Sequence, residues 1–188
     1  MNIKKNFAFT FFEILIVLII ISIMSFLGLP HYHFLFEQTT NQILQSQLTD
    51  IIQFARTEAS ARNLPIVICK SSDGNRCGGE WGSHMIVFIN ENEDGILIDR
   101  SKVLMVMQLK AHSGFLHWRS FPIYHTYILF NPKQREVSDN GTFWFCPQPH
   151  AQVSWALTLN KKGQTKLYQN KNGNIKDNHG RILTCDQD

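Results

Sequence analysis

The sequence predicts an α+β fold in which a long N-terminal helix packs on an antiparallel β-sheet or sandwich. Three observations support this prediction. Residues 9–29 are almost entirely apolar, and apolar side chains then recur at helical spacing as far as residue 62. The rest of the 188-residue chain consists of short β-type runs separated by turn signals. A hydrophobic share of 44% is sufficient for one buried core, which excludes a disordered or low-complexity protein.

The apolar segment 9–29 is predicted to span a membrane. An α-helix of this length would be about 30 Å long, which matches the hydrocarbon core of a bilayer. Lys4 and Lys5 precede it, so the positive-inside rule predicts a cytoplasmic N-terminus and an exported C-terminal domain. No small-residue cleavage site follows the segment, and we therefore expect it to remain on the mature protein. Glu13 is its one charged residue, and a carboxylate in that environment indicates a partner.

Residues 30–62 are predicted to continue the helix in amphipathic form. Apolar positions recur there at intervals of three and four residues, namely Leu44, Leu48, Ile51 or Ile52, Ala55 and Ala59. We expect this face to dock against the domain that follows. Pro65 ends the helix, because proline has no backbone donor and disfavours helix at the preceding residue.

Residues 63–188 are predicted to form the β domain. Turn signals such as Asp73-Gly74, Asn140-Gly141 and Lys162-Gly163 separate its apolar runs. The candidate strands are Ile66–Lys70, Met85–Asn90, Val103–Leu109, Tyr127–Phe130, Thr142–Cys146, Val153–Asn160 and Gln164–Gln169. Because turn signals separate these strands, we expect an antiparallel sheet or small sandwich that packs on the helix.

The four cysteines all lie beyond the apolar segment, on the side of the membrane where disulfides form. Cys69 and Cys77 flank a loop short enough for a local disulfide, which would leave Cys146 to pair with Cys185 and tie the C-terminal tail to the sheet. The sequence alone allows three connectivities. Disulfides are favoured over a zinc site, because the chain has no Cys-x-x-Cys and structural zinc is uncommon outside the cytoplasm.

No motif in the sequence points to catalysis or to a metal ion. Residues 90–95 are similar to the start of a calcium loop, but Ser101 stands where the bidentate glutamate would be, so a hairpin turn is favoured. The eight histidines are scattered and form no metal set. Because the chain has no nucleophile elbow, phosphate loop or carboxylate pair, we expect no enzymatic activity, no cofactor and no small-molecule substrate.

The start of the apolar segment resembles a known processing signal. Lys4-Lys5-Asn6-Phe7-Ala8-Phe9-Thr10-Phe11-Phe12-Glu13 is similar to the leader of type IV prepilins and type II secretion pseudopilins. The resemblance implies that prepilin peptidase removes residues 1–8 by cutting between Ala8 and Phe9, and that the new amine of Phe9 is methylated. Ala8 stands where the family usually has glycine. Glu13 becomes the fifth mature residue, and Pro30 falls at the position of a helix-kinking proline.

A role for Glu13 follows from burial inside a helical filament. Its carboxylate can pair there with the amine of Phe9 on a neighbouring subunit, and this pairing relieves both buried charges. We therefore expect Glu13 to be an assembly residue.

Three further segments narrow the resemblance to the GspH/FimT group of minor pilins and pseudopilins. These segments are Phe54–Cys69, then Trp81-Gly82 followed by Val87-Phe88 and residues 90–95, and finally Gly141–Cys146. The resemblance implies a non-enzymatic filament subunit that crosses the bacterial inner membrane once, with its β domain in the periplasm and other pilin or pseudopilin subunits as partners. It leaves the type IV pilus and the type II secretion pseudopilus equally open. A membrane-tethered periplasmic binding module that never assembles is a further alternative.

The C-terminal part of the chain supports an alternative function, the binding of double-stranded DNA during DNA uptake. In the branch of the family associated with uptake, a Gly-Arg-x-Arg turn contacts phosphates. The matching turn here is Gly163-Gln164-Thr165-Lys166, which lacks both arginines. The surrounding stretch is nevertheless basic, and an affinity based on it would fall steeply with salt. The candidate contacts are Lys161, Lys162, Gln164, Lys166, Lys171, Lys176 and Arg181.

Overall fold

The structure, a computed structural model, describes residues 10–109, 111, 114–121, 124–132, 136–137, 140–148, 150–170, 175–177 and 180–185, with the backbone alone at 26–38 and 136–137. Three of the predicted site residues, Ala8, Phe9 and Lys171, lie outside the described residues. The chain divides into two compact units, residues 1–39 and residues 40–188.

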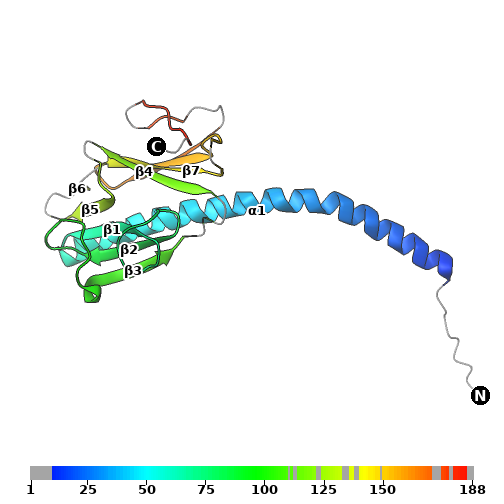
Figure 1. Ribbon diagram of the computed structural model, residues 1–188, viewed down its shortest axis with the longest axis horizontal. Helices are drawn as coiled ribbons and strands as arrows, with labels where there is room; N and C mark the ends of the chain where they lie inside the picture. The colour runs from blue at the N-terminus through cyan, green and yellow to red at the C-terminus, as the bar shows by residue number, and fades with distance from the viewer. Residues whose placement is uncertain are drawn as a thin grey trace, which may run out of the picture. The chain divides into compact units, whose positions relative to one another are not determined.

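One helix, α1 (Phe11–Arg62), covers both helical segments that the sequence predicts (Figure 1). It begins after Thr10, whose carbonyl and hydroxyl oxygens accept hydrogen bonds from the N–H of Glu13 at 3.1 and 3.3 Å. The helical backbone continues through Pro30, whose side chain lies outside the described residues, so the kink stays a prediction. The helix ends at Arg62, and the next residue, Asn63, adopts the left-handed conformation with a φ of 54°.

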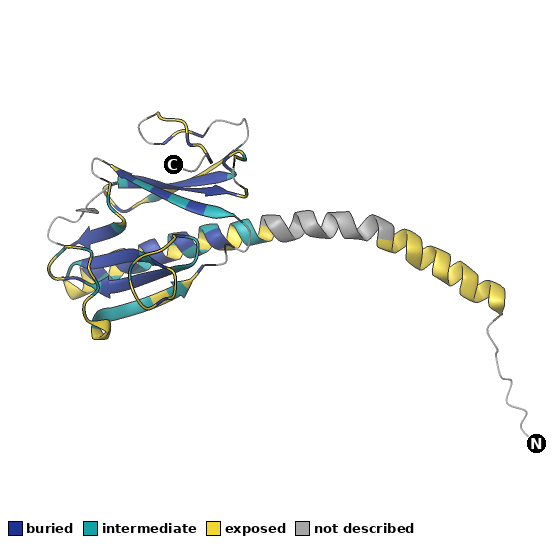
Figure 2. Cartoon of the chain, viewed as in Figure 1, coloured by how far each residue is buried: buried dark blue, intermediate teal, exposed yellow. Residues whose placement is uncertain are grey.

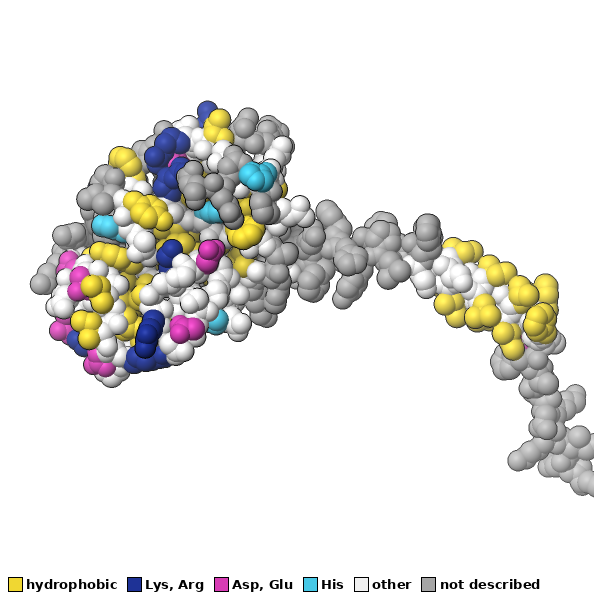
Figure 3. Space-filling view, viewed as in Figure 1, with side chains coloured by type: hydrophobic (Ala, Val, Ile, Leu, Met, Phe, Trp, Pro, Cys, Tyr) yellow, Lys and Arg dark blue, Asp and Glu magenta, His cyan; other side chains and the backbone are white. Residues whose placement is uncertain are grey.

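The N-terminal part of α1 exposes its side chains. Every residue from 11 to 25 is exposed (yellow in Figure 2), and most of them are apolar (yellow in Figure 3). Among the described residues, no helix combines the length and the apolarity that crossing a bilayer requires. The membrane span therefore stays a prediction.

The second unit contains two antiparallel sheets, as the sequence predicts. The first sheet has the strand order β3-β2-β1-β5-β6, and the second has the order β4-β7-β8-β9. A single turn of 3-10 helix, η1 (Arg100–Lys102), precedes β3. The strands are β1 (Ile66–Ser71), β2 (His84–Ile89), β3 (Val103–Gln108), β4 (Phe115–Phe121), β5 (Tyr127–Asn131), β6 (Glu136–Val137), β7 (Asn140–Cys146), β8 (Trp155–Leu159) and β9 (Thr165–Gln169).

The C-terminal part of α1 shares one hydrophobic core with both sheets. Its predicted apolar face is fully buried, with Leu48, Ile51 and Ala55 at 0% exposure. Burial of each large apolar side chain contributes about 1.5–3 kcal/mol. Aromatic rings from the second sheet fill the centre, where Trp118 lies 4.4 Å from Phe143 between ring centroids. The helix is therefore an integral part of the β domain from residue 40 onward.

The outer face of each sheet is closed by a disulfide-linked segment. Cys69–Cys77 fixes the loop after β1 beside the outer face of the first sheet. Cys146–Cys185 ties the C-terminal tail to β7, where Ile175 and Leu183 of the tail pack into a second cluster. Both pairings are those that the sequence favours.

Candidate interaction surfaces

The first candidate surface is the exposed N-terminal part of α1. Glu13 lies in the first turn, where a negative charge is stabilised by the helix dipole by about 0.3–1 kcal/mol. Its carboxylate has no hydrogen-bond or ion-pair partner among the described residues. The neighbouring apolar side chains are also exposed, with Phe11 at 83% and Phe12 at 70%. This surface is suited to burial in lipid or among other helices.

The second candidate surface is the turn between β8 and β9, which carries the predicted basic residues Lys161 and Lys162. Both are exposed. Asn160 organises the turn, because its side-chain oxygen accepts hydrogen bonds at 3.0 Å from the N–H groups of Lys162 and Gln164. The Gln164 side chain bonds in return to the Asn160 amide at 3.0 Å. Gln164 therefore stabilises the turn. In the Gly-Arg-x-Arg turn of the uptake branch, arginines would instead place positive charge at this turn.

Further cations lie across the outer face of the second sheet. Lys166 on β9 is exposed, with its amine 4.8 Å from the centroid of the Tyr168 ring. The strand register aligns Arg119 of β4 with Thr142, Thr158 and Lys166 in one cross-strand row. Sequence reasoning did not find Arg119, because β4 was not among the predicted strands. The row adds one guanidinium to the predicted basic residues.

Fewer cations of the C-terminal tail are available to an external partner than the sequence indicates. The predicted contact Arg181 is bound to Asp177, a buried carboxylate, at 2.7 Å. Asp177 also lies 4.0 Å from Arg119, so it connects the tail to β4. Lys176 is exposed beside it. Of the predicted tail cations in the described residues, Lys176 is therefore the one available for an external partner.

A cleft of about 610 Å³ borders β4 and is lined by both charged and aromatic side chains. His117 and Trp144 stack there with ring centroids 5.1 Å apart, and the Arg119 guanidinium lies 5.2 Å from the Trp144 ring. Burial lowers the pKa of His117 below 6.5, although the carboxylate of Glu80 opposes this effect. The lowered pKa favours the neutral form of the His117 ring. Within the described ranges, no three His, Cys, Asp or Glu side chains gather to hold a metal ion.

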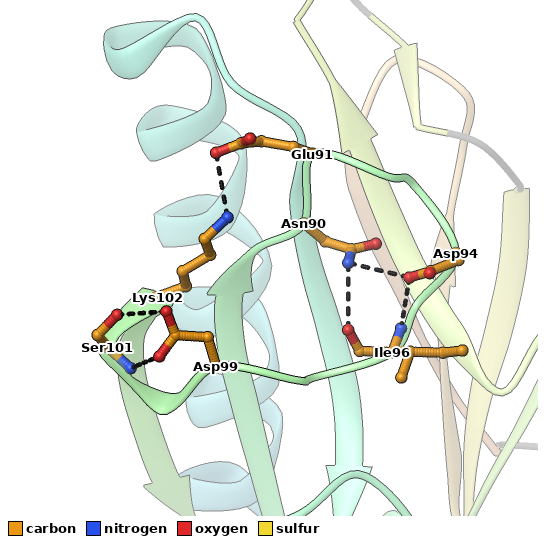
Figure 4. A network of polar contacts seen from close by, with 7 residues as sticks. All are labelled: Asn90, Glu91, Asp94, Ile96, Asp99, Ser101 and Lys102. Carbon is orange, nitrogen blue, oxygen red and sulfur yellow. Dashed lines mark hydrogen bonds and ion pairs between the residues drawn. The ribbon is translucent and has the colours of Figure 1, made fainter.

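The loop between β2 and β3 is held by a network of polar contacts (Figure 4). Asn90 is buried and donates to Asp94 at 3.0 Å and to the carbonyl of Ile96 at 3.2 Å. Hydrogen bonds from the N–H of Ile96 and from Asn90 lower the pKa of Asp94 below 3.8. The Asp99 carboxylate accepts from Ser101 and its pKa is lowered in the same way. This segment forms the connection of a long hairpin, as the sequence predicts.

Comparisons with known proteins agree with the resemblance in the sequence. A family model described as type II transport protein GspH matches residues 45–163, well over half of the chain. No curated protein matches the chain. The type IV minor pilin FimU of Pseudomonas aeruginosa is 17% identical with a TM-score of 0.52, and the match covers 70% of this chain and 90% of FimU. The minor pseudopilin EpsH from the type 2 secretion system of Vibrio cholerae is 12% identical with a TM-score of 0.47. This match covers 71% of this chain and 97% of EpsH.

The likeness to FimU shows a shared fold, and the family match extends from the buried part of α1 to the turn between β8 and β9. The matched residues include the whole first sheet, strands β4, β7 and β8 of the second sheet, and nearly all of the core that joins them to the helix. The chain therefore belongs to the GspH family of minor pilins and pseudopilins.

Proposed function

We propose that the chain is a structural, non-enzymatic subunit of a type IV pilus or a type II secretion pseudopilus, assembled through α1. The observation that supports this most directly is the exposed apolar surface of residues 11–25, which carries Glu13 as its single charge. A helix that is apolar on all sides requires lipid or other helices around it. The same helix is anchored at its other end in the core of the β domain. Such a chain can connect a filament core to a folded surface domain.

Before assembly, the proposed location of the subunit is the inner membrane, with the N-terminus in the cytoplasm and the β domain in the periplasm. Lys4 and Lys5 support this orientation, and the two disulfides suit an oxidising compartment. Prepilin peptidase is the proposed processing partner, and the mature chain would begin at Phe9 with a methylated amine.

Cleavage by prepilin peptidase tests this proposal. Full-length chain produced with an active prepilin peptidase is expected to lose residues 1–8 and to gain one methyl group, as measured by intact mass. The variant Ala8→Leu is expected to block cleavage, because the position before the cut requires a small side chain. Ala8→Gly is the matched control and is expected to be cleaved. A chain left uncut by a peptidase that processes another prepilin would instead favour a tethered module that never assembles.

DNA binding during uptake is a second candidate function. It is supported by Lys161, Lys162 and Lys166, which are exposed on one hairpin. An exposed aromatic ring, Tyr168, lies below the Lys166 amine and offers a stacking surface. The partner would be double-stranded DNA, contacted mainly at its phosphates.

A salt series with duplex DNA tests the second function on the oxidised fragment 40–188. The variant Lys161→Ala, Lys162→Ala, Lys166→Ala is expected to bind more weakly, and its log–log salt slope should fall by about 0.9 for each phosphate that the variant no longer neutralises. Lys102→Ala is the matched control, because that amine is already paired with Glu91 at 3.2 Å. If the wild-type fragment fails to bind at low salt, the DNA function is rejected and the structural role stands alone.

A further inference from the structure

The loop between β2 and β3 exposes two isoleucine side chains to solvent. Ile96 is 58% exposed and Ile98 is 79% exposed, whereas Leu97 between them packs against the outer cluster of the first sheet. We call residues 95–98 the isoleucine ridge. It borders two hollows, of about 240 and 920 Å³, which both include Ile96, Leu97 and Ile98 in their walls. Exposed large apolar side chains gathered at one place are typical of a contact surface.

The ridge is held in place from both ends. At its start, the N–H of Gly95 donates to Asn90 at 3.0 Å and the N–H of Ile96 donates to Asp94 at 2.9 Å. Gly95 has a φ of 74°, and a Cβ atom there would overlap the Tyr127 ring, so only glycine fits. At its end, Asp99 caps η1. The isoleucines are therefore presented on a fixed backbone, which reduces the entropy lost when a partner binds.

The charges beside the larger hollow indicate the chemistry of that partner. Arg76 and Arg100 line this hollow with the isoleucines. Arg100 is oriented by hydrogen bonds to the carbonyl and the side chain of Asn75. Arg76 is exposed, and its guanidinium has no hydrogen-bond or ion-pair partner in the described part of the chain. Asp73 also lines the hollow, but its carboxylate already accepts hydrogen bonds from the backbone N–H groups of Asn75 and Arg76.

We propose that the isoleucine ridge docks into an apolar hollow bordered by carboxylates on another pilin-type subunit of the same filament. The inference rests on the proposed assembly role. The two isoleucines would supply the buried contact, and Arg76 and Arg100 would pair with the carboxylates at its border. This division between an apolar centre and a charged border is the usual anatomy of a specific protein interface.

Site-specific photo-crosslinking in cells tests the proposal on the full-length chain. A benzophenone amino acid at Ile98 is expected to give a product with one protein that itself carries a prepilin leader, at least tenfold stronger than the product from the same amino acid at Ile182. Ile182 is the matched control, since it is an isoleucine 53% exposed on the C-terminal tail. Arg76→Glu is expected to reduce the Ile98 product at least tenfold, whereas Arg76→Lys retains it.

Three results would overturn the proposal: equal products from Ile98 and Ile182, a product with a second copy of this chain, or a product unchanged by Arg76→Glu. Incorporation of the wild-type chain into filaments is measured in parallel. If the wild-type chain is incorporated but Ile98 gives no specific product, the docking inference fails and the assembly role stands. If the wild-type chain is never incorporated, the assembly role itself fails.

Discussion

The Glu13→Ala variant is expected to remain in the membrane but to be lost from the filament, with incorporation reduced at least tenfold. The Glu13 carboxylate has no partner in the described part of its own chain, so its proposed partner is the Phe9 amine of a neighbouring subunit. Removal of one member of a buried ion pair leaves the other charge uncompensated, at a cost of about 3–5 kcal/mol. The variant stays in the membrane, because its apolar surface is unchanged. Immunoblots of the membrane and sheared-filament fractions measure both quantities.

Two further variants make the Glu13 experiment specific. Glu13→Asp retains the charge and is expected to be incorporated better than Glu13→Ala. Asp50→Ala removes an exposed carboxylate from the same helix, at a position within the β domain, and is expected to have no effect. Incorporation of Glu13→Ala at the wild-type level would contradict the proposed role of this residue.

The disulfide Cys146–Cys185 is expected to contribute most of the covalent stabilisation of the β domain. It closes 39 residues of chain, whereas Cys69–Cys77 closes 8. On the chain-entropy account, the longer loop corresponds to about 4 kcal/mol of unfolding free energy and the shorter one to about 2.5 kcal/mol. Alanine is the suitable replacement, because Cys146 and Cys185 are buried and alanine introduces no buried hydroxyl group.

Urea unfolding of the fragment 40–188 measures this difference. The Cys146→Ala, Cys185→Ala variant is expected to lose more stability than Cys69→Ala, Cys77→Ala, which is the matched control. Loss of the longer disulfide should also release the tail, whose Thr184 carbonyl accepts from the Trp144 indole at 3.0 Å. A smaller loss for the Cys146–Cys185 variant than for the control would show that packing alone fixes the tail.

The elements that the sequence predicts well are those with local signals. The apolar face of α1 repeats at helical spacing, and the end of the helix is marked by Asn63 and Pro65. All the predicted strands are present, with ends shifted by up to two residues. The favoured disulfide pairing followed from the short loop between Cys69 and Cys77.

The elements that were missed depend on contacts between distant parts of the chain. The sequence of β4 alternates buried Leu116 and Trp118 with half-buried His117 and Arg119 and follows the turn pair Ser113-Gly114, so it carries a short local strand signal that the prediction did not use. Its partner β7 lies many residues later, and only that pairing aligns Arg119 with Lys166. The two-residue strand β6 is too short to carry any pattern of its own.

The candidate surfaces were predicted only in part, for the same reason. The sequence identified the basic tail residues. It could not show that Arg181 forms an ion pair with Asp177 or that the Gln164 side chain forms a hydrogen bond with Asn160. It identified residues 90–95 as a turn, but the exposure of Ile98 depends on how the loop is held against the first sheet.

The most direct test of the assembly role is the mass of the N-terminal peptide of this chain recovered from purified filaments. If the chain has the proposed assembly role, it is present in these filaments and begins at Phe9 with a methylated amine. Recovery of the chain only from membranes, with Met1 to Ala8 still attached, would contradict it.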